Sequence, residues 1–147
     1  MNIRDARRED LEAIVELAGR ARSAARWPAS FYSDLFGSED SGRISLVAEH
    51  AGVIQGFLIA RCVGDESELE NIMVAEDARQ RGVGLKLIRE LANAARDCHV
   101  NRIFLEVRES NVAARSFYET CGFLSEGRRK GYYSDPAEDA VLYTLAL

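Results

Sequence analysis

The chain has 147 residues, of which 47% are hydrophobic and 29% charged, and its formal net charge at pH 7 is -5. This size and composition predict one soluble globular domain, residues 1–147, with a core large enough to fold without disulfides or metal. The negative charge argues against sequence-independent nucleic-acid binding, and the absence of an 18-residue apolar run argues against a membrane-spanning helix.

The N-terminal part predicts one strand and two helices. A short apolar start around Ile3 predicts an edge strand. A first helix follows, with Glu9 and Asp10 in its first turn, where the helix dipole favours negative charge. Pro28 then interrupts the chain, and a short second helix is expected to end at Gly37. Helical spacing of apolar residues marks the two helices, with Leu11, Ile14, Val15 and Ala18 in the first and Phe31, Leu35 and Phe36 in the second.

Three β-rich runs come next, at residues 44–49, 53–63 and 69–74. Polar or glycine-containing segments, 50–52 and 64–67, separate them. Short strands joined by short turns predict an antiparallel meander.

The second half alternates helices with strands. The segment 84–97 has one apolar face and predicts a long helix, and 102–107 alternates as a strand. Asn111 is a good N-cap for a further helix, and Gly122 suits the position just after its end. Two final strands are expected at 123–133 and 140–147. The order β-α-α-β-β-β-α-β-α-β-β predicts an α+β fold with a mixed sheet of about seven strands and about four helices on its faces.

A glycine-containing turn joins the third β-rich run to the long helix and reads Arg79-Gln80-Arg81-Gly82-Val83-Gly84-Leu85. The first N–H groups of a helix have no intrahelical partners and lie at the positive end of the dipole, so they bind anions. Gly82 and Gly84 let a phosphate approach the backbone. The GxGxxG pattern of a dinucleotide fold and the GxxxxGK pattern followed by Ser or Thr are both absent.

The turn fits R-x-x-G-x-G, which resembles the coenzyme A pyrophosphate motif of the GNAT acetyltransferases. A second resemblance to that family lies in 105–111, 116–119 and 121–123, and the likeness is densest over 69–140. It implies the GNAT acyl-CoA N-acyltransferase fold. It also implies transfer of an acetyl group from acetyl-CoA to a primary amine by direct attack, without a metal.

The resemblance also implies which residues hold the coenzyme. Asn111 would contact it, although the capping role alone explains an asparagine there. A backbone N–H near Val74 would serve the thioester oxygen. The remaining implied contacts are Ile72, Met73 and Val74, which would pair with the pantetheine arm through their backbone, and Gln80, Arg81, Gly82, Val83, Gly84 and Leu85, which would hold the pyrophosphate.

Glu106 matches the family's general base and Tyr118 its general acid. Chemistry supports a base, because an attacking amine must lose a proton. Neutralising an α-amine at pH 7 costs about 1.4 kcal/mol against about 4.6 kcal/mol for lysine, so an N-terminal amine is the easier acceptor. Structural alternatives are a solvated strand position for Glu106 and a core tyrosine packed beside Phe117 for Tyr118.

The acceptor side carries a narrower resemblance. Segments 128–133 and 138–140 resemble family members that acetylate the N-terminal alanine of a small-subunit ribosomal protein, which implies a protein partner. A monomer or weak homodimer without direct nucleic-acid contact is also expected. Glu138 and Asp139 either orient the acceptor's amino terminus or are exposed turn acids. Two alternatives stay open: a small-molecule acceptor such as an amino acid or polyamine, and an inactive acetyl-CoA sensor. An open groove between 27–37 and 128–136 would favour a protein acceptor.

The remaining chemistry-bearing residues predict structural roles. Cys62, Cys98 and Cys121 are odd in number and lack metal-ligand spacing, so reduced, buried thiols are expected rather than a disulfide or zinc site. His50 and His99 are interpreted as turn and surface residues. The start of the chain lacks a basic segment followed by an apolar one, which predicts a cytoplasmic location.

Overall fold

The structure is a computed structural model, and it describes residues 1–20, 28–36 and 42–147. The predicted order of elements is confirmed in these residues, with two added 3-10 turns. The elements are β1 (Asn2–Asp5), η1 (Arg8–Asp10), α1 (Leu11–Gly19), α2 (Ala29–Asp34), β2 (Arg43–His50), β3 (Val53–Val63), β4 (Glu66–Val74), η2 (Glu76–Ala78), α3 (Val83–Asp97), β5 (Arg102–Arg108), α4 (Val112–Thr120), β6 (Leu124–Tyr133) and β7 (Glu138–Ala146).

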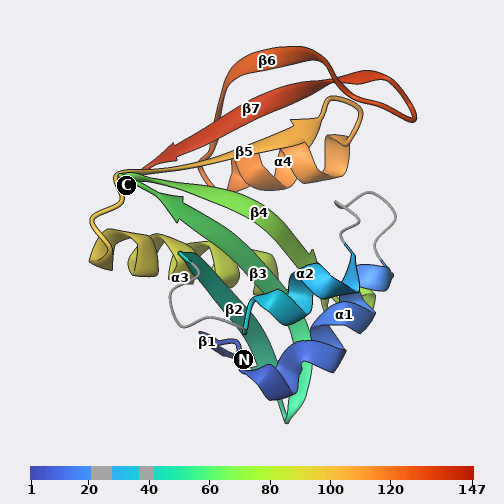
Figure 1. Cartoon of the computed structure of the whole chain (residues 1–147), viewed down its shortest axis with the longest axis vertical. Helices are drawn as coiled ribbons and strands as arrows, with labels where there is room; N and C mark the ends of the chain where they lie inside the picture. Colours follow the sequence, from blue (N-terminus) through green and yellow to red (C-terminus); the bar gives the residue numbers. More distant parts are fainter. Residues whose placement is uncertain (21–27, 37–41) are drawn as a thin grey trace.

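The described strands form one seven-stranded sheet in the order β1-β2-β3-β4-β5-β7-β6. Neighbouring strands are antiparallel except for β4 and β5, which are parallel. That pairing ends where Glu68 lies opposite Phe104. Figure 1 shows β4 and β5 meeting beside the C-terminus and spreading apart at their other ends. We call the unpaired region beyond Glu68 and Phe104 the splay.

Each face of the sheet has its own hydrophobic core. One core joins α3 to the strands through residues such as Leu87 and Leu91, and α4 packs against it. The other lies under α1 and α2, around Ile14 and Tyr32, and Figure 1 shows these two helices on the opposite side of the sheet from α3. Because Leu105 belongs to the α3 core and side chains alternate along a strand, its neighbours on β5 face the side of α1 and α2.

Several predicted boundaries were wrong. The expected 64–67 loop is shorter, because Gly64 adopts a left-handed conformation (φ 62°) and Glu66 already pairs with Val63. The long helix begins one residue earlier than predicted, at Val83. The last strand begins at Glu138 rather than at 140. The predicted end of the second helix at Gly37, and part of the 27–37 segment, lie outside the described residues.

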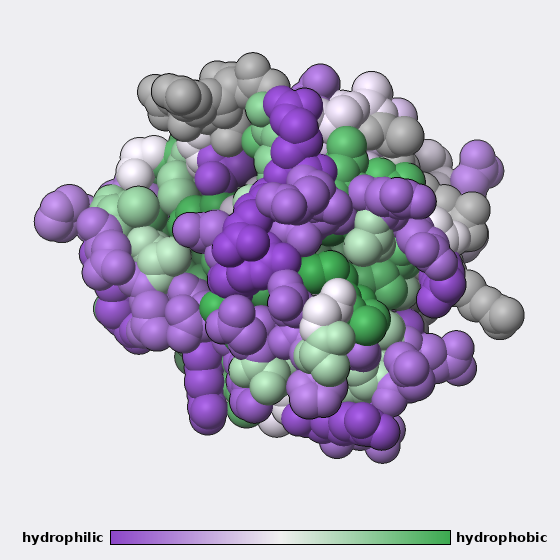
Figure 2. Space-filling model, turned by 90° about the horizontal axis from the view of Figure 1, so that it is seen from below, coloured by the Kyte–Doolittle hydropathy of each residue, from purple (hydrophilic) through white to green (hydrophobic). Residues whose placement is uncertain are grey.

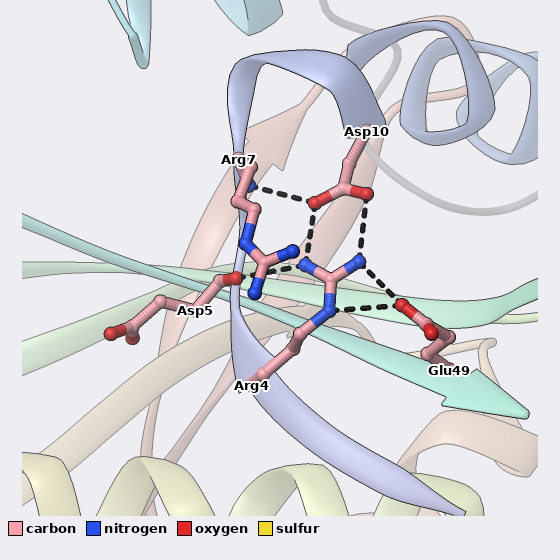
Figure 3. A network of polar contacts seen from close by, with 5 residues as sticks. All are labelled: Arg4, Asp5, Arg7, Asp10 and Glu49. Atoms are coloured by element: carbon pink, nitrogen blue, oxygen red, sulfur yellow. Dashed lines mark hydrogen bonds and ion pairs between the residues drawn. The ribbon is translucent and has the colours of Figure 1, made fainter. Parts of the chain in front are cut away.

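An ion-pair network fastens the N-terminal strand to the sheet (Figure 3). The Arg4 guanidinium donates to both oxygens of Asp10, at 2.8 and 3.0 Å, and to Glu49. Asp10 also accepts the Arg7 N–H at 2.7 Å. The hydrogen bond from Arg4 lowers the pKa of Asp10. The role expected for Asp10, charge in the first turn of a helix, is therefore incomplete, because its carboxylate is buried and ties η1 to β1 and β2.

Figure 2 shows one face of the molecule, on which hydrophobic patches lie between hydrophilic side chains. The prediction of buried cysteines was wrong: Cys62 and Cys121 are only partly buried and Cys98 is exposed, although all three thiols are free. Burial raises the pKa of Cys62, and raises that of Cys121 to about 11.

His50 and His99 are exposed at the ends of β2 and α3, as predicted. Within the described ranges, no helix is both long and apolar enough to span a membrane.

Candidate active site

The end of β4 presents unpaired backbone to the splay. The Ala75 N–H donates to the Gln55 carbonyl at 2.7 Å. Hydrogen-bonded and non-hydrogen-bonded pairs alternate along an antiparallel ladder, so the next bonded pair is Phe57 with Met73. The N–H and C=O groups of Ile72 and Val74 then point away from β3, toward β5. Of the three residues predicted to pair with a pantetheine arm, two therefore have their backbone groups directed into the splay.

The predicted phosphate-binding turn opens α3. Gln80 and Gly82 both adopt left-handed conformations, with φ of 62° and 80°. The Lys86 N–H donates to the Gly82 carbonyl at 3.0 Å, which starts the helical hydrogen bonds. The preceding amides at the helix start have no intrahelical acceptor and lie at the positive end of the helix dipole. Exposed Arg81 adds positive charge beside them, so the turn is suited to a diphosphate.

The turn is attached to β4 by Arg79, the arginine that opens its R-x-x-G-x-G pattern. The Arg79 Nε donates to the Val74 carbonyl at 3.1 Å. This contact occupies the carbonyl of Val74 and leaves its N–H as the group available in the splay. It supports the expectation of a backbone donor near Val74.

Gly84 brings the turn against α4. A Cβ built on Gly84 would lie 2.8 Å from Cζ of Phe117, closer than real Cβ contacts. Only glycine lets the first turn of α3 approach this ring so closely. Because Phe117 precedes Tyr118, this packing places the anion-binding turn next to the helix that carries the predicted acid.

Asn111 caps α4, as predicted. Its Oδ1 accepts the Ala114 N–H at 3.2 Å. The capping role is thus sufficient to explain the asparagine, and a contact with the coenzyme stays a prediction.

Tyr118 lies in an aromatic cluster on the α3 and α4 side of the sheet. Its ring centroid is 5.4 Å from that of Phe117, 5.7 Å from Phe123 and 6.3 Å from Tyr143. Burial raises the pKa of the Tyr118 hydroxyl, which therefore stays protonated through the neutral range. No described residue hydrogen-bonds this hydroxyl. The ring thus has the predicted packing role, and the hydroxyl is free to donate a proton.

Glu106 lies on the opposite face of the sheet. Its side chain is only 16% exposed, which contradicts the alternative of a solvated strand residue. One carboxylate oxygen, Oε1, accepts from Nη1 of Arg129 at 2.8 Å. The other, Oε2, is buried without a hydrogen-bond partner among the described residues. A buried carboxylate oxygen without a partner is costly and is suited to receive a proton donor from a bound molecule.

One further carboxylate of β4, Glu68, lies near Glu106, and Glu70 lies near Glu68; neither was predicted from the sequence. Burial raises the pKa of Glu68, and the negative charges of Glu70 and Glu106 raise it further. Glu70 is paired with the Arg43 Nε at 2.9 Å. The alternation of acidic and buried residues in 66–70 was the available signal. This acidic surface favours a cationic group such as an ammonium.

The β6–β7 hairpin borders the site. Glu138 accepts the Ser110 N–H at 2.7 Å and the Arg108 Nη1 at 3.2 Å, so it braces the start of β7 against the turn before α4. Asp139 accepts the Gly131 N–H at 2.9 Å. Neither carboxylate is an unpaired acid in a turn, since each accepts hydrogen bonds that fix the position of the hairpin.

These features form one arrangement around the splay. The predicted base and acid lie on opposite faces of the sheet, and the anion-binding turn packs against the helix that carries the acid. Open backbone along β4 can pair with an extended, amide-containing arm. The donors fit an acyl thioester carried on a pantetheine diphosphate. In the described parts of the chain, no group of three or more His, Cys, Asp or Glu side chains is placed to hold a metal ion.

Comparisons with known proteins indicate one family. The model of the acetyltransferase (GNAT) family matches residues 8–123. A ribosomal protein bS18-alanine N-acetyltransferase from Salmonella typhimurium is 32% identical over 140 residues, covering 94% of this chain and 92% of that protein.

Solved structures show the same likeness. The ribosomal-protein-S18-alanine N-acetyltransferase from Escherichia coli has a TM-score of 0.85 and 30% identity, covering 99% of this chain and 92% of its own. An acetyltransferase from Bacillus anthracis, solved in complex with acetyl coenzyme A, has a TM-score of 0.69 and 29% identity, covering 74% of this chain and 65% of its own. The family match includes the turn, Glu106 and Tyr118.

Proposed function

The chain belongs to the acetyltransferase (GNAT) family and is an acetyl-CoA-dependent N-acetyltransferase, and we propose that its acceptor is the N-terminal α-amine of a protein, of the ribosomal-protein-alanine type. The observation that carries this proposal is the buried, unpartnered Oε2 of Glu106 beside the splay. The names of the Salmonella and Escherichia coli relatives support the protein acceptor.

The surroundings of Glu106 support an extended acceptor. Arg129, its partner, is 58% exposed, and the neighbouring Tyr132 is 50% exposed. The site therefore opens onto the surface of the β6–β7 hairpin rather than into an enclosed cavity. A polypeptide can lie along such a surface with its amino terminus at Glu106.

We assign the coenzyme to the turn and to β4. The backbone N–H and C=O of Ile72 would pair with the pantetheine arm, the Val74 N–H would lie at the thioester end of that arm, and the amides at the start of α3 would bind the diphosphate. When bound, acetyl-CoA supplies an acetyl group activated as a thioester. Met73 contributes through packing, because its backbone groups belong to the ladder with β3.

The chain's own residues then handle protons. Glu106 takes a proton from the acceptor amine at Oε2, directly or through a water molecule, which restores the nitrogen lone pair. The N–H of Val74 stabilises negative charge on the acyl oxygen. Tyr118 holds a proton that its hydroxyl can deliver to the departing sulfur. The two proton-transfer groups act on opposite faces, so they do not compete for one proton.

A panel of acceptors tests this proposal. Thiol release is followed at pH 7 with acetyl-CoA and a peptide beginning with alanine, the same peptide with a blocked N-terminus and an internal lysine, and spermidine. We expect the free N-terminus to be acetylated fastest, because its amine is the easiest to deprotonate. Faster acetylation of the lysine or of spermidine would contradict the protein N-terminal acceptor.

A polyamine is the second candidate acceptor, and one observation favours it. Glu68, Glu70 and Glu106 gather negative charge near the splay, and such a surface attracts a multiply charged amine. The spermidine arm of the panel decides between the two acceptors. An absence of thiol release with every amine would instead leave an acetyl-CoA-binding sensor.

A further inference from the structure

Arg129 reaches the proposed base from a distant strand. Its Nη1 lies 2.8 Å from Oε1 of Glu106, and its guanidinium stacks over the Tyr132 ring at 4.3 Å from the centroid. Exposed ion pairs contribute only about 0–1 kcal/mol to stability. Fold stability is therefore a weak explanation for this contact. Its position at the proposed base suggests a role in the reaction.

Strand register brings the two side chains together. Ala140 of β7 pairs with Arg108 of β5 on one side and with Arg129 of β6 on the other. Directly paired residues share a face, and so do residues two apart on one strand. Glu106, Arg108 and Arg129 therefore lie on the same face. The small side chain of Ala140 lies between the two arginine positions.

The contact makes the two oxygens of Glu106 unequal. Oε1 is held by Arg129, whereas Oε2 is buried and has no partner in the described residues. A carboxylate held through one oxygen keeps the other in a fixed direction. The planar guanidinium, itself stacked on Tyr132, is suited to hold it.

The other charged and titratable groups around Glu106 leave Arg129 as its cationic partner. Glu68 and Glu70 project from β4, and on β5 the Arg108 guanidinium is committed to Glu138. Tyr133 faces Glu106 from β6 as a neutral phenol, and burial raises its pKa. Among the described residues, Arg129 is the cation in ion-pair contact with Glu106.

We propose that Arg129 is a positioning residue for acetyl transfer: it holds Oε1 of Glu106 so that Oε2 faces the acceptor amine. This proposal rests on the proposed role of Glu106 as general base. The amine's proton passes to Oε2, and Arg129 itself touches neither the acceptor nor the coenzyme.

The test is the pH dependence of kcat and kcat/KM for the alanine peptide in Arg129→Ala, Arg129→Lys and Arg128→Ala. Arg128→Ala is the matched control, because it removes the same charge one residue away. Arg128 pairs with Glu109 and not with Glu106. In Arg129→Ala we expect kcat for the alanine peptide to fall about tenfold across the pH range, because Oε2 of Glu106 is no longer held in a fixed direction. KM for the peptide should change less than kcat.

Arg129→Lys should restore part of the profile, since it keeps the charge but not the planar fork. Arg128→Ala should keep the wild-type profile, and KM for acetyl-CoA should be unchanged in all three variants. An Arg129→Ala profile equal to that of the Arg128 control would overturn the proposal. An increase in kcat/KM would also overturn it, because Arg129 would then block the amine site.

Glu106→Gln separates the proposed role of Glu106 from the proposed role of Arg129. If this variant retains full turnover, Glu106 is not the base, and both the base assignment and the role of Arg129 fail. If it loses turnover while Arg129→Ala behaves like wild type, only the role of Arg129 fails.

Discussion

The coenzyme side and the acceptor side of the site use different chemical groups. On the coenzyme side, backbone groups do most of the proposed binding: the amides at the start of α3 and the open edge of Ile72 and Val74. On the acceptor side, the groups are side chains from separate strands, Glu68 on β4, Glu106 on β5 and Arg129 on β6. A backbone site depends on where glycine allows close approach, whereas a side-chain site depends on strand register.

This difference predicts separable failures. Replacing a glycine of the turn should weaken coenzyme binding and leave the acceptor side intact. Replacing a carboxylate of the acceptor side should impair proton transfer and leave coenzyme binding intact. A variant that impairs coenzyme binding and proton transfer equally would contradict this separation of the two sides.

The largest effect is expected for Glu106→Gln. The amide keeps the shape of the side chain but cannot accept the amine's proton, so kcat should fall by about 10²–10⁴-fold. Steady-state kinetics with the alanine peptide measures this loss.

Calorimetry on the same variant should show unchanged affinity for acetyl-CoA. The matched control is Glu126→Gln, which alters an exposed carboxylate paired with Arg102 on the same sheet and should retain wild-type kcat. A Glu106→Gln enzyme with normal kcat would remove the base from the mechanism.

Gly84→Ala should produce the next largest effect, now on the coenzyme side. The new Cβ would meet the Phe117 ring at 2.8 Å. Overpacking of about 1–3 kcal/mol would weaken acetyl-CoA binding by about tenfold to a hundredfold. Calorimetry measures the affinity.

Gly19→Ala is the control for Gly84→Ala, because nothing lies within 4 Å of a Cβ at this position in α1. It should bind acetyl-CoA like wild type and unfold at the same or a slightly higher temperature. Normal acetyl-CoA affinity in Gly84→Ala would show that the turn tolerates a side chain, against this account.

Tyr118→Phe should have a smaller effect. A thiolate is a stable leaving group near neutral pH, so removing the acid costs about tenfold in kcat, less than removing the base. Stability should change little at neutral pH, because no described residue hydrogen-bonds the hydroxyl.

The raised pKa of Tyr118 also predicts a difference in alkali. The pKa of this tyrosine is higher in the folded protein than in the unfolded chain, where it is about 10. The unfolded chain therefore loses the proton first, and the free energy of unfolding falls as pH rises above about 10. Wild type should therefore lose more stability above about pH 10 than Tyr118→Phe does. Thermal unfolding at several pH values measures this, and parallel curves for the two proteins would contradict the buried hydroxyl.

Glu138→Gln should have the smallest effect, confined to the acceptor side. Loosening the brace to Ser110 and Arg108 should raise KM for the peptide by about twofold to fivefold and leave acetyl-CoA affinity unchanged.

Hydrogen bonds from Ser110 lower the pKa of Glu138. The contacts of Glu138 with Ser110 and Arg108 are therefore fully formed above the ordinary pKa of glutamate. They are lost as the pH falls through the lowered pKa of Glu138 in the folded protein. The peptide KM of wild type should approach that of Glu138→Gln only at such acid pH. A KM gap between the two proteins that persists there would rule out this ionisation as the cause.

The same contrast explains what the sequence could predict. The turn at 79–85 is contiguous, so strand, glycines and helix start are visible together. The element order followed from periodicity, and Glu106 was found through the family resemblance, supported by the need of an attacking amine for a base. Tyr118 was found through the family resemblance of its helix.

The acceptor side was less accessible to prediction. Arg129 lies 23 positions from Glu106, and their contact depends on the register of β5, β7 and β6. The close packing of Gly84 on Phe117 likewise joins distant helices. Cys98 was predicted to be buried and is exposed, because composition does not tell which side of a helix end faces the core.

The central claim is that the splay receives the coenzyme along the free edge of β4. Amide hydrogen exchange, followed by NMR with and without acetyl-CoA, tests it residue by residue. The N–H groups of Ile72 and Val74 should exchange freely in the unbound protein and become protected on binding. The Met73 N–H, already bonded to β3, should be protected in both states. Unchanged exchange at Ile72 and Val74, with protection appearing elsewhere, would contradict the account.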